Sequence, residues 1–207
     1  MSQITYPNSY APAVQRLQPA TAQKVFASPF NGAQQVVNLP GGEAWQLEMS
    51  HVNLEDEARG ELTAFYTKTR VSRNTFLITN HTAPQLGQFG GAPTVATGSQ
   101  MGSVLVVSSA GDLVSSWACV GDFISINNEL KMVLADAGTT SAQVVSLELW
   151  PPLRLSPDSG STVVVTSPVG TFRLANATAF NMKPPRYMTD ISAIAIEAVS
   201  SERVVDL

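Results

Sequence analysis

The chain has 207 residues, of which 44% are hydrophobic and only 14% charged, and its formal net charge is −4. This length allows one large domain or two small ones, while the charged fraction lies well below the roughly 25% of an average soluble domain. The 12 Lys and Arg residues are scattered, which disfavours nucleic acid as a primary partner because a phosphate backbone is bound by clustered cations. Low charge indicates either a surface that partner subunits cover in an assembly or a neutral surface rich in Ser and Thr.

The sequence has no feature of a membrane or disulfide-bonded protein. Its longest apolar stretches, such as residues 192–199, are far shorter than the ~20 residues of a membrane helix. The N-terminal residues lack the basic and then apolar layout of a secretory signal, and the single cysteine, Cys119, permits no internal disulfide. We therefore expect a chain made in a cytosol-like compartment, and we predict no membrane binding.

The first half begins with an expected arm, residues 1–21, rich in Pro, Ser, Gln and Ala. After it, β-prone runs and turn signals predict strands at residues 23–30, 34–39 and 45–52. Asn31-Gly32 is a hairpin turn signal between the first two. Pro40-Gly41-Gly42 is expected to close the second, and strict alternation marks the third as a half-buried strand.

One helix is predicted over residues 53–70. Asn53 is a good N-cap residue, and Leu54, Ala58, Leu62 and Phe65 form one apolar stripe at helical spacing. Three carboxylates follow the cap (Glu55, Asp56 and Glu57), and favourable interaction with the helix dipole accounts for them without a metal.

Residues 75–79 return to a strand, and the Gly-rich and Pro-rich residues 80–102 predict a long loop or a domain border. Turn signals then recur every 8–15 residues between β-prone runs, which favours a small antiparallel barrel or sandwich. These runs are residues 103–108, 123–126, 130–134, 144–150, 162–166 and 171–174. A final run, residues 191–199, is apolar on both faces except at Ser192 and Glu197, so we expect it in the centre of a sheet.

No residue pattern indicates catalysis, a cofactor or a metal, and we predict none of the three. Two histidines and one cysteine cannot supply a zinc quartet. Asp158-Ser159-Gly160 is similar to the nucleophile segment of some serine proteases, but the string fits a turn between strands. Among the other candidates, His51 is interpreted as a buried or cap-adjacent histidine, and Cys119, Trp117 and Trp150 as core residues.

The string Trp150-Pro151-Pro152-Leu153-Arg154 holds an arginine directly after a strand. Prolines cannot donate to a strand ladder, so we expect Pro151 and Pro152 to force an extended exit. An arginine at such a corner can form a bidentate contact with a carboxylate. We interpret Arg154 as a structural pin, with Asp122 or Asp136 as its partner.

Four short motifs in the second half succeed one another in a distinctive order: Gly121-Asp122 leading into a strand, Leu130 to Asp136, Leu147 to Arg154, and Gly170-Thr-Phe172-Arg173-Leu174. This succession resembles the distal tail protein, a minor tail or tail-tip ring protein, of long-tailed siphophages. The order and spacing of the motifs carry the resemblance, which spans roughly residues 25 to 199.

The resemblance implies a mainly β fold: a β-sandwich ring-forming domain with one α-helix, plus an inserted small antiparallel β-barrel domain. The ring-forming domain would comprise residues 22–85 together with 172–200, and the barrel residues 86–171. Residues 201–207 would form a C-terminal tail. The structural residues would be Gly121, Asp122, Trp150, Pro151, Pro152, Arg154, Phe172 and Arg173.

The function implied is that of a ring, typically a hexamer, at the tail tip of the virion. It would join the tail tube protein to the tail-tip hub protein and the tail fibres, with DNA only as cargo through its lumen, and would be assembled in the cytoplasm of the bacterial host. Three other functions stay open: another phage tail or head-tail completion protein, a small β-fold hydrolase using Ser159 or a carboxylate, and a glycan-binding module using Trp117 or Trp150.

Overall fold

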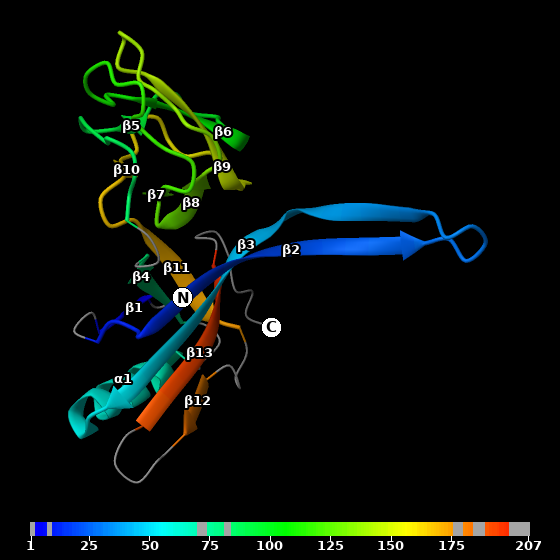
Figure 1. Cartoon of the computed structure of the whole chain (residues 1–207), viewed down its shortest axis with the longest axis vertical. Helices are drawn as coiled ribbons and strands as arrows, with labels where there is room; N and C mark the ends of the chain where they lie inside the picture. The colour runs from blue at the N-terminus through cyan, green and yellow to red at the C-terminus, as the bar shows by residue number, and fades with distance from the viewer. Residues whose placement is uncertain are drawn as a thin grey trace.

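The computed structural model describes residues 3–7, 10–69, 74–80, 84–175, 180–183 and 189–198. It is mainly β with one helix, as the sequence predicts, and its strands form two sheets. Figure 1 shows a barrel above a larger sheet, from which a long two-stranded ribbon projects to one side.

The larger sheet has seven strands in the order β1-β4-β11-β13-β3-β2, with β12 also beside β13. They are β1 (Gln3–Thr5), β2 (Val14–Ala27), β3 (Gln34–Leu54), β4 (Thr75–Thr79), β11 (Val169–Leu174), β12 (Phe180–Lys183) and β13 (Thr189–Glu197). The pair β1–β4 is parallel and the other pairs are antiparallel. Hydrogen bonds join these strands into one continuous sheet, because β13 pairs with β3 along one edge and with β11 and β12 along the other.

The helix α1 (Asp56–Thr69) packs on one face of this sheet and buries the predicted stripe at Ala58, Leu62 and Phe65. Alternating residues of the strands complete the core from the other side, as the period of two in a strand requires. The buried members of this core are Tyr6, Trp45, Leu47, Met49, Leu62, Phe65, Tyr66, Phe76, Ile78, Phe123, Leu130, Phe172, Leu174, Ile191, Ala193 and Ala195. Phe123 and Leu130 belong to the barrel, so the two folded regions share this core.

The smaller sheet is antiparallel and has the order β10-β7-β8-β9-β6-β5. Its strands are β5 (Thr94–Val95), β6 (Gly102–Ser108), β7 (Phe123–Ile126), β8 (Glu129–Val133), β9 (Val145–Leu153) and β10 (Val163–Val164). A bridge between Thr94 and Thr162 joins the two ends of the sheet, and the amide of Val95 donates to the carbonyl of Ser161 at 2.9 Å. The sheet therefore closes almost completely into the expected small barrel.

Several boundaries differ from those expected. Residues 3–5 and 14–21, expected in an arm, are strands of the larger sheet. The chain returns to that sheet at Val169, slightly before the expected residue 172. Pairing with a neighbour explains each extension, since sheet hydrogen bonds outweigh the weak local preference of a Pro-rich or Gln-rich segment.

Three expected breaks lie within or beside strands of the structure. β3 runs through Pro40-Gly41-Gly42, and β9 runs through Pro151 and Pro152 to Leu153. Asn53 is not the helix N-cap, because pairing of Leu54 with Thr189 keeps β3 extended to residue 54. Asn53 instead has a φ of 57°, a conformation that asparagine tolerates better than most residues.

Candidate functional site

The most unusual feature of the surface is the ribbon, residues 23–38, formed by the outer parts of β2 and β3. Its strands pair in register from Gln23–Asn38 to Ala27–Gln34, and the expected turn closes it, with the amide of Ser28 donating to Ala33 at 2.8 Å. Figure 1 shows that it extends away from both folded regions. Within the described part of the chain, this ribbon has no third strand beside it.

Apolar side chains of the ribbon are exposed to solvent. Val25 and Val36 are register partners and are each 53% exposed. Phe26 is 49% exposed, and Phe30, at the tip, is 97% exposed. An isolated two-stranded hairpin is at best marginally stable in water, and an open edge with exposed apolar residues invites association. The ribbon therefore has the properties of a segment that packs on another molecule.

The register shift between Thr21 and Gln23 marks where the ribbon leaves the sheet. A β-bulge bends a strand and increases its local twist, and Pro40-Gly41-Gly42 faces this point on β3. The signals that we expected to end a strand thus coincide with the bend between the sheet and the ribbon.

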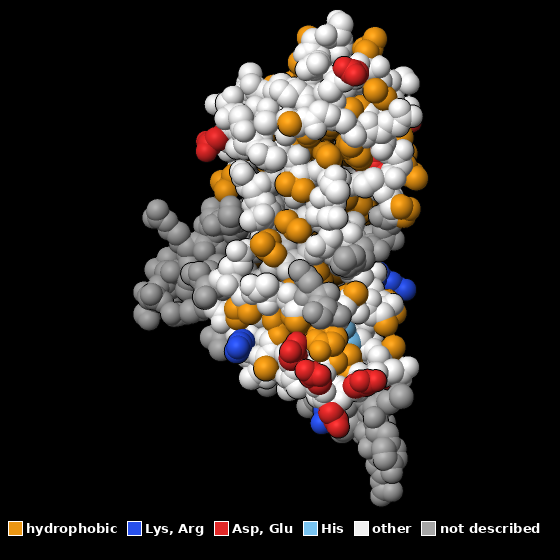
Figure 2. Space-filling model, turned by 90° about the vertical axis from the view of Figure 1, so that its left-hand side faces the viewer, with side chains coloured by type: hydrophobic (Ala, Val, Ile, Leu, Met, Phe, Trp, Pro, Cys, Tyr) orange, Lys and Arg blue, Asp and Glu red, His pale blue; other side chains and the backbone are white. Residues whose placement is uncertain are grey.

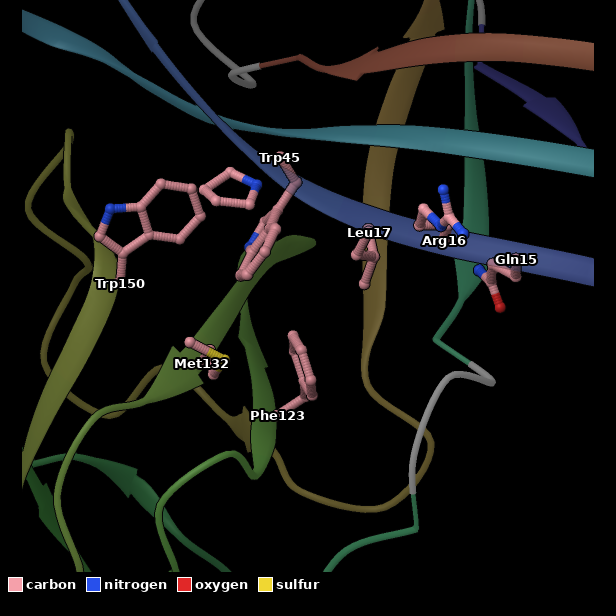
Figure 3. A pocket seen from close by; sticks show the side chains of 8 residues that line it. Gln15, Arg16, Leu17, Trp45, Phe123, Met132 and Trp150 are labelled. Atoms are coloured by element: carbon pink, nitrogen blue, oxygen red, sulfur yellow. The ribbon is translucent and has the colours of Figure 1, made fainter.

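An apolar groove of about 590 Å³ opens beside the base of the ribbon, between the sheet and the barrel. It is lined by Gln15, Arg16, Leu17, Pro19, Trp45, Phe123, Met132 and Trp150. Figure 3 shows Trp150 at one end, Gln15 at the other, and Trp45, Met132 and Phe123 between them. The rings of Trp45 and Trp150 meet edge to face, with centroids 4.4 Å apart, a favourable aromatic geometry.

A hydrogen bond between the sheet and the barrel holds the two walls of the groove together. Trp45 Nε1 donates to the carbonyl of Leu130 at 3.0 Å. On the barrel side, the buried Lys131 Nζ lies 2.9 Å from Glu129 Oε2 and donates to the carbonyl of Pro152 at 3.1 Å. The Trp45–Leu130 hydrogen bond and the Trp45–Trp150 ring contact therefore connect the sheet wall of the groove to its barrel wall.

Arg154 pairs with a carboxylate, but with neither of the two that we expected. Its guanidinium donates to Glu197 Oε2 at 2.7 Å, and Glu197 Oε1 accepts from the amide of Leu130 at 2.8 Å. Glu197 is buried in β13, so this pair connects the sheet to the barrel. Burial raises the pKa of the Glu197 carboxyl, an effect that Arg154 opposes.

The two expected partners have other roles. Asp122 accepts backbone hydrogen bonds from Leu86, Gly87 and Cys119, which ties the start of the barrel to the turn before β7. Asp136 accepts from the amide of Val120 at 2.7 Å. The expectation was wrong because the actual partner, Glu197, lies 43 residues after Arg154 in the chain and belongs to the larger sheet.

The other residues implied by the resemblance occupy two places. Gly121 has a φ of 91°, which favours glycine, and it opens the turn into β7. Pro151 and Pro152 continue β9 beside Trp150, which is half-buried at the groove rather than a full core residue. In the larger sheet, Phe172 is buried and Arg173 is half-buried on the opposite face.

Residues considered for catalysis or sugar binding are dispersed. Ser159 Oγ donates to the carbonyl of Ala96 at 3.3 Å in an exposed turn. His51 is buried beside the core of the larger sheet, where its Nε2 lies 2.7 Å from Tyr6 Oη. His81 lies outside the described residues. Trp117 is fully buried in the barrel, which confirms it as a core residue, while Cys119 is only half-buried.

The described residues include no cluster of three or more potential metal-ligating His, Cys, Asp or Glu side chains. In the same part of the chain, no helix is long and apolar enough to cross a membrane. Figure 2 shows that acidic side chains gather over the region of α1, whereas charged side chains are few on the barrel above it.

No protein-family model matches the chain, and a search of curated proteins gives no match either. The geometry of the ribbon and the groove therefore carries the functional argument.

Proposed function

We propose that this protein is a structural, non-enzymatic ring protein at the distal end of a long phage tail. In this function, copies of the chain form a ring, as a hexamer, between the tail tube protein and the tail-tip hub protein with its tail fibres. DNA passes through the lumen only as cargo. The protein would be assembled in the cytoplasm of the bacterial host and act in the virion.

The observation that carries this proposal is the projecting ribbon. Phe26, Phe30 and Val36 expose apolar surface on a segment that no other described part of the chain covers. Association would bury that surface, and burial of apolar surface stabilises by roughly 25 cal/mol per Å². A chain that acts as a monomer gains nothing from an exposed ribbon, whereas a subunit of an assembly gains an interface.

The low charge of the chain supports the same function. The ribbon holds one charged residue, Lys24, whose Nζ lies 5.1 Å from the centroid of the Phe26 ring. DNA passes more easily through a lumen whose surface has no clustered cations, because such clusters bind phosphates. The net charge of −4 agrees with this requirement.

Removal of the ribbon tests the proposal. In the test variant, residues 24–37 are replaced by a short glycine-containing turn that joins Gln23 to Asn38. We expect the wild-type chain to form rings of six times 22.0 kDa, alone or after addition of tail tube protein, in native mass spectrometry and electron micrographs. The variant should keep the Tm of the wild type and stay monomeric. A wild-type chain that stays monomeric in both conditions would refute the proposal.

A glycan-binding module is the second candidate, because half-buried Trp150 lines an open groove beside Trp45. Tryptophan commonly stacks on sugar rings through its apolar face. Titration of the protein with cell-wall oligosaccharides, followed by tryptophan fluorescence, separates the two functions. Quenching in the wild type that disappears in Trp150→Phe would favour the binding module.

A further inference from the structure

We propose that the groove between the sheet and the barrel receives the ribbon of a second copy of this chain. Phe30 would enter beside Leu17, toward the end of the groove away from Trp150. This inference rests on the proposed ring and names the two surfaces that would meet in it. It joins Phe30, which is 97% exposed at the tip of the ribbon, to the apolar groove of about 590 Å³.

The length of the ribbon prevents Phe30 from entering the groove of its own chain, so the groove that it fills must belong to another copy. Pro19 lines the groove, and Phe30 follows eleven residues later, about 35 Å away at ~3.3 Å per residue. Pairing with β3 keeps the ribbon extended, so the tip cannot fold back into its own groove. A compact chain of this length is about 40 Å across, so the tip reaches the position of an adjacent subunit.

The contact is head to tail, because the surface that donates differs from the surface that accepts. Such heterologous contacts close into rings when the rotation between neighbours allows it. Each copy would offer one ribbon and one groove, so every groove in a closed ring would be filled.

Polarity and size also match. The ribbon beyond Lys24 carries no charged residue as far as Gly42, and Arg16 is the one charged residue among those that line the groove. Docking would therefore bury no carboxylate of either surface, and Arg16, the one cation of the groove, is exposed; burial of an unpaired charge would be costly. A groove of about 590 Å³ lies in the ~300–1,000 Å³ range of sites that enclose ligands, ample for a phenylalanine and the adjacent Pro29.

Charge supplies a second point of complementarity. Glu148 is exposed on β9, on the same face as Trp150 and about 7 Å before it along the strand. Lys24 precedes Phe30 by six residues on the ribbon, about 20 Å when extended. In the proposed arrangement the ribbon runs from Leu17 toward Trp150, which brings Lys24 toward Glu148 of the neighbouring copy.

Two variants of the full chain test the head-to-tail contact. Phe30→Asp alters the ribbon and leaves the groove intact, whereas Met132→Glu alters the groove and leaves the ribbon intact. By native mass spectrometry we expect each variant alone to be monomeric. An equimolar mixture should form heterodimers and nothing larger, because it can make only one kind of intact contact. Leu113→Asp, at an exposed barrel residue (72% exposed), is the control and should assemble like the wild type.

Charge exchange provides a test at exposed residues, where folding is not at stake. Lys24→Glu and Glu148→Lys should each weaken assembly of the chain at least several-fold, and the double variant should restore it. If the wild type forms rings and the Met132→Glu and Glu148→Lys variants form them equally well, the groove is not the receptor, although the proposed ring stands. If the wild type never assembles, the proposed function itself fails.

Discussion

Glu197 connects the sheet and the barrel through its two carboxylate oxygens, one bonded to the amide of Leu130 and the other to Arg154. In the sequence it is a polar exception in an apolar strand, and Arg154 is a cation after two prolines. Each residue could be identified as unusual from the sequence. Their pairing could not, because 43 residues separate them and only the tertiary fold brings them together.

Arg154→Met leaves the buried Glu197 carboxylate without its cation. Loss of one partner of a buried ion pair typically costs about 3–5 kcal/mol, and we expect a decrease of that size in the free energy of unfolding, measured with urea. The control is Arg59→Met, since the Arg59–Asp56 pair is exposed and surface substitutions usually stay within about 0.5 kcal/mol. Equal stability of Arg154→Met and the wild type would show that Arg154 is not a pin.

His51 makes stability depend on pH. It is buried beside Tyr6 and Tyr66, and burial lowers its pKa below 6.5. The unfolded chain therefore binds a proton more readily than the folded chain. The stabilising contribution is complete above pH 6.5 and is lost as the pH falls toward the lowered pKa, by up to about 1.4 kcal/mol per pH unit.

The measurement is urea unfolding of the wild type and His51→Gln between pH 5 and 8. The difference between the two proteins isolates His51, because Glu197 titrates in both. We expect the difference in unfolding free energy to change below pH 6.5 and to stay constant above it. A constant difference throughout would mean that His51 has the same pKa in the folded and unfolded chains.

At the level of elements, the sequence predicts most strands and the helix, because alternation and helical spacing are local signals. It also predicts the turn at Asn31-Gly32. It does not predict β1, nor the length of β2, since Gln3–Thr5 and Val14–Thr21 become strands through pairing with β4 and β3. The ribbon and the groove could not be foreseen as a pair of surfaces, because burial and exposure depend on the whole fold.

The ribbon should differ from the sheet in hydrogen exchange. Its amides, such as those of residues 24–27, are bonded only within an exposed two-stranded segment, whereas those of residues 191–195 lie in a central strand. Exposed segments with few packed contacts open at low free-energy cost. We expect fast exchange of the ribbon in dilute monomer and slow exchange after assembly, measured by mass spectrometry. Fast exchange in both states would contradict a buried ribbon in the assembly.

The whole molecule is organised around the core that the sheet and the barrel share. Phe123 and Leu130 of the barrel lie in the core of the sheet, and Trp45 of the sheet contacts Trp150 of the barrel. The barrel has a second core of its own, centred on buried residues such as Trp117. The barrel strands lie between β4 and β11 in the chain, and the barrel is anchored to the sheet through apolar contacts, a buried ion pair and backbone hydrogen bonds.

Such a junction should make the two regions unfold together. Hydrogen exchange at increasing urea concentration, read separately in peptides of β13 and β7, should give one midpoint for both in the wild type. Trp45→Ala removes the ring that contacts Trp150 and the donor to Leu130, and truncation of a buried tryptophan costs about 3–5 kcal/mol. Because this loss falls on the junction and the sheet core, while Trp117 and its neighbours keep their contacts, β13 should open at a lower urea concentration than β7. Coincident midpoints in the variant would mean that other contacts suffice to couple the regions, and separate midpoints in the wild type would show that the shared core does not unite them.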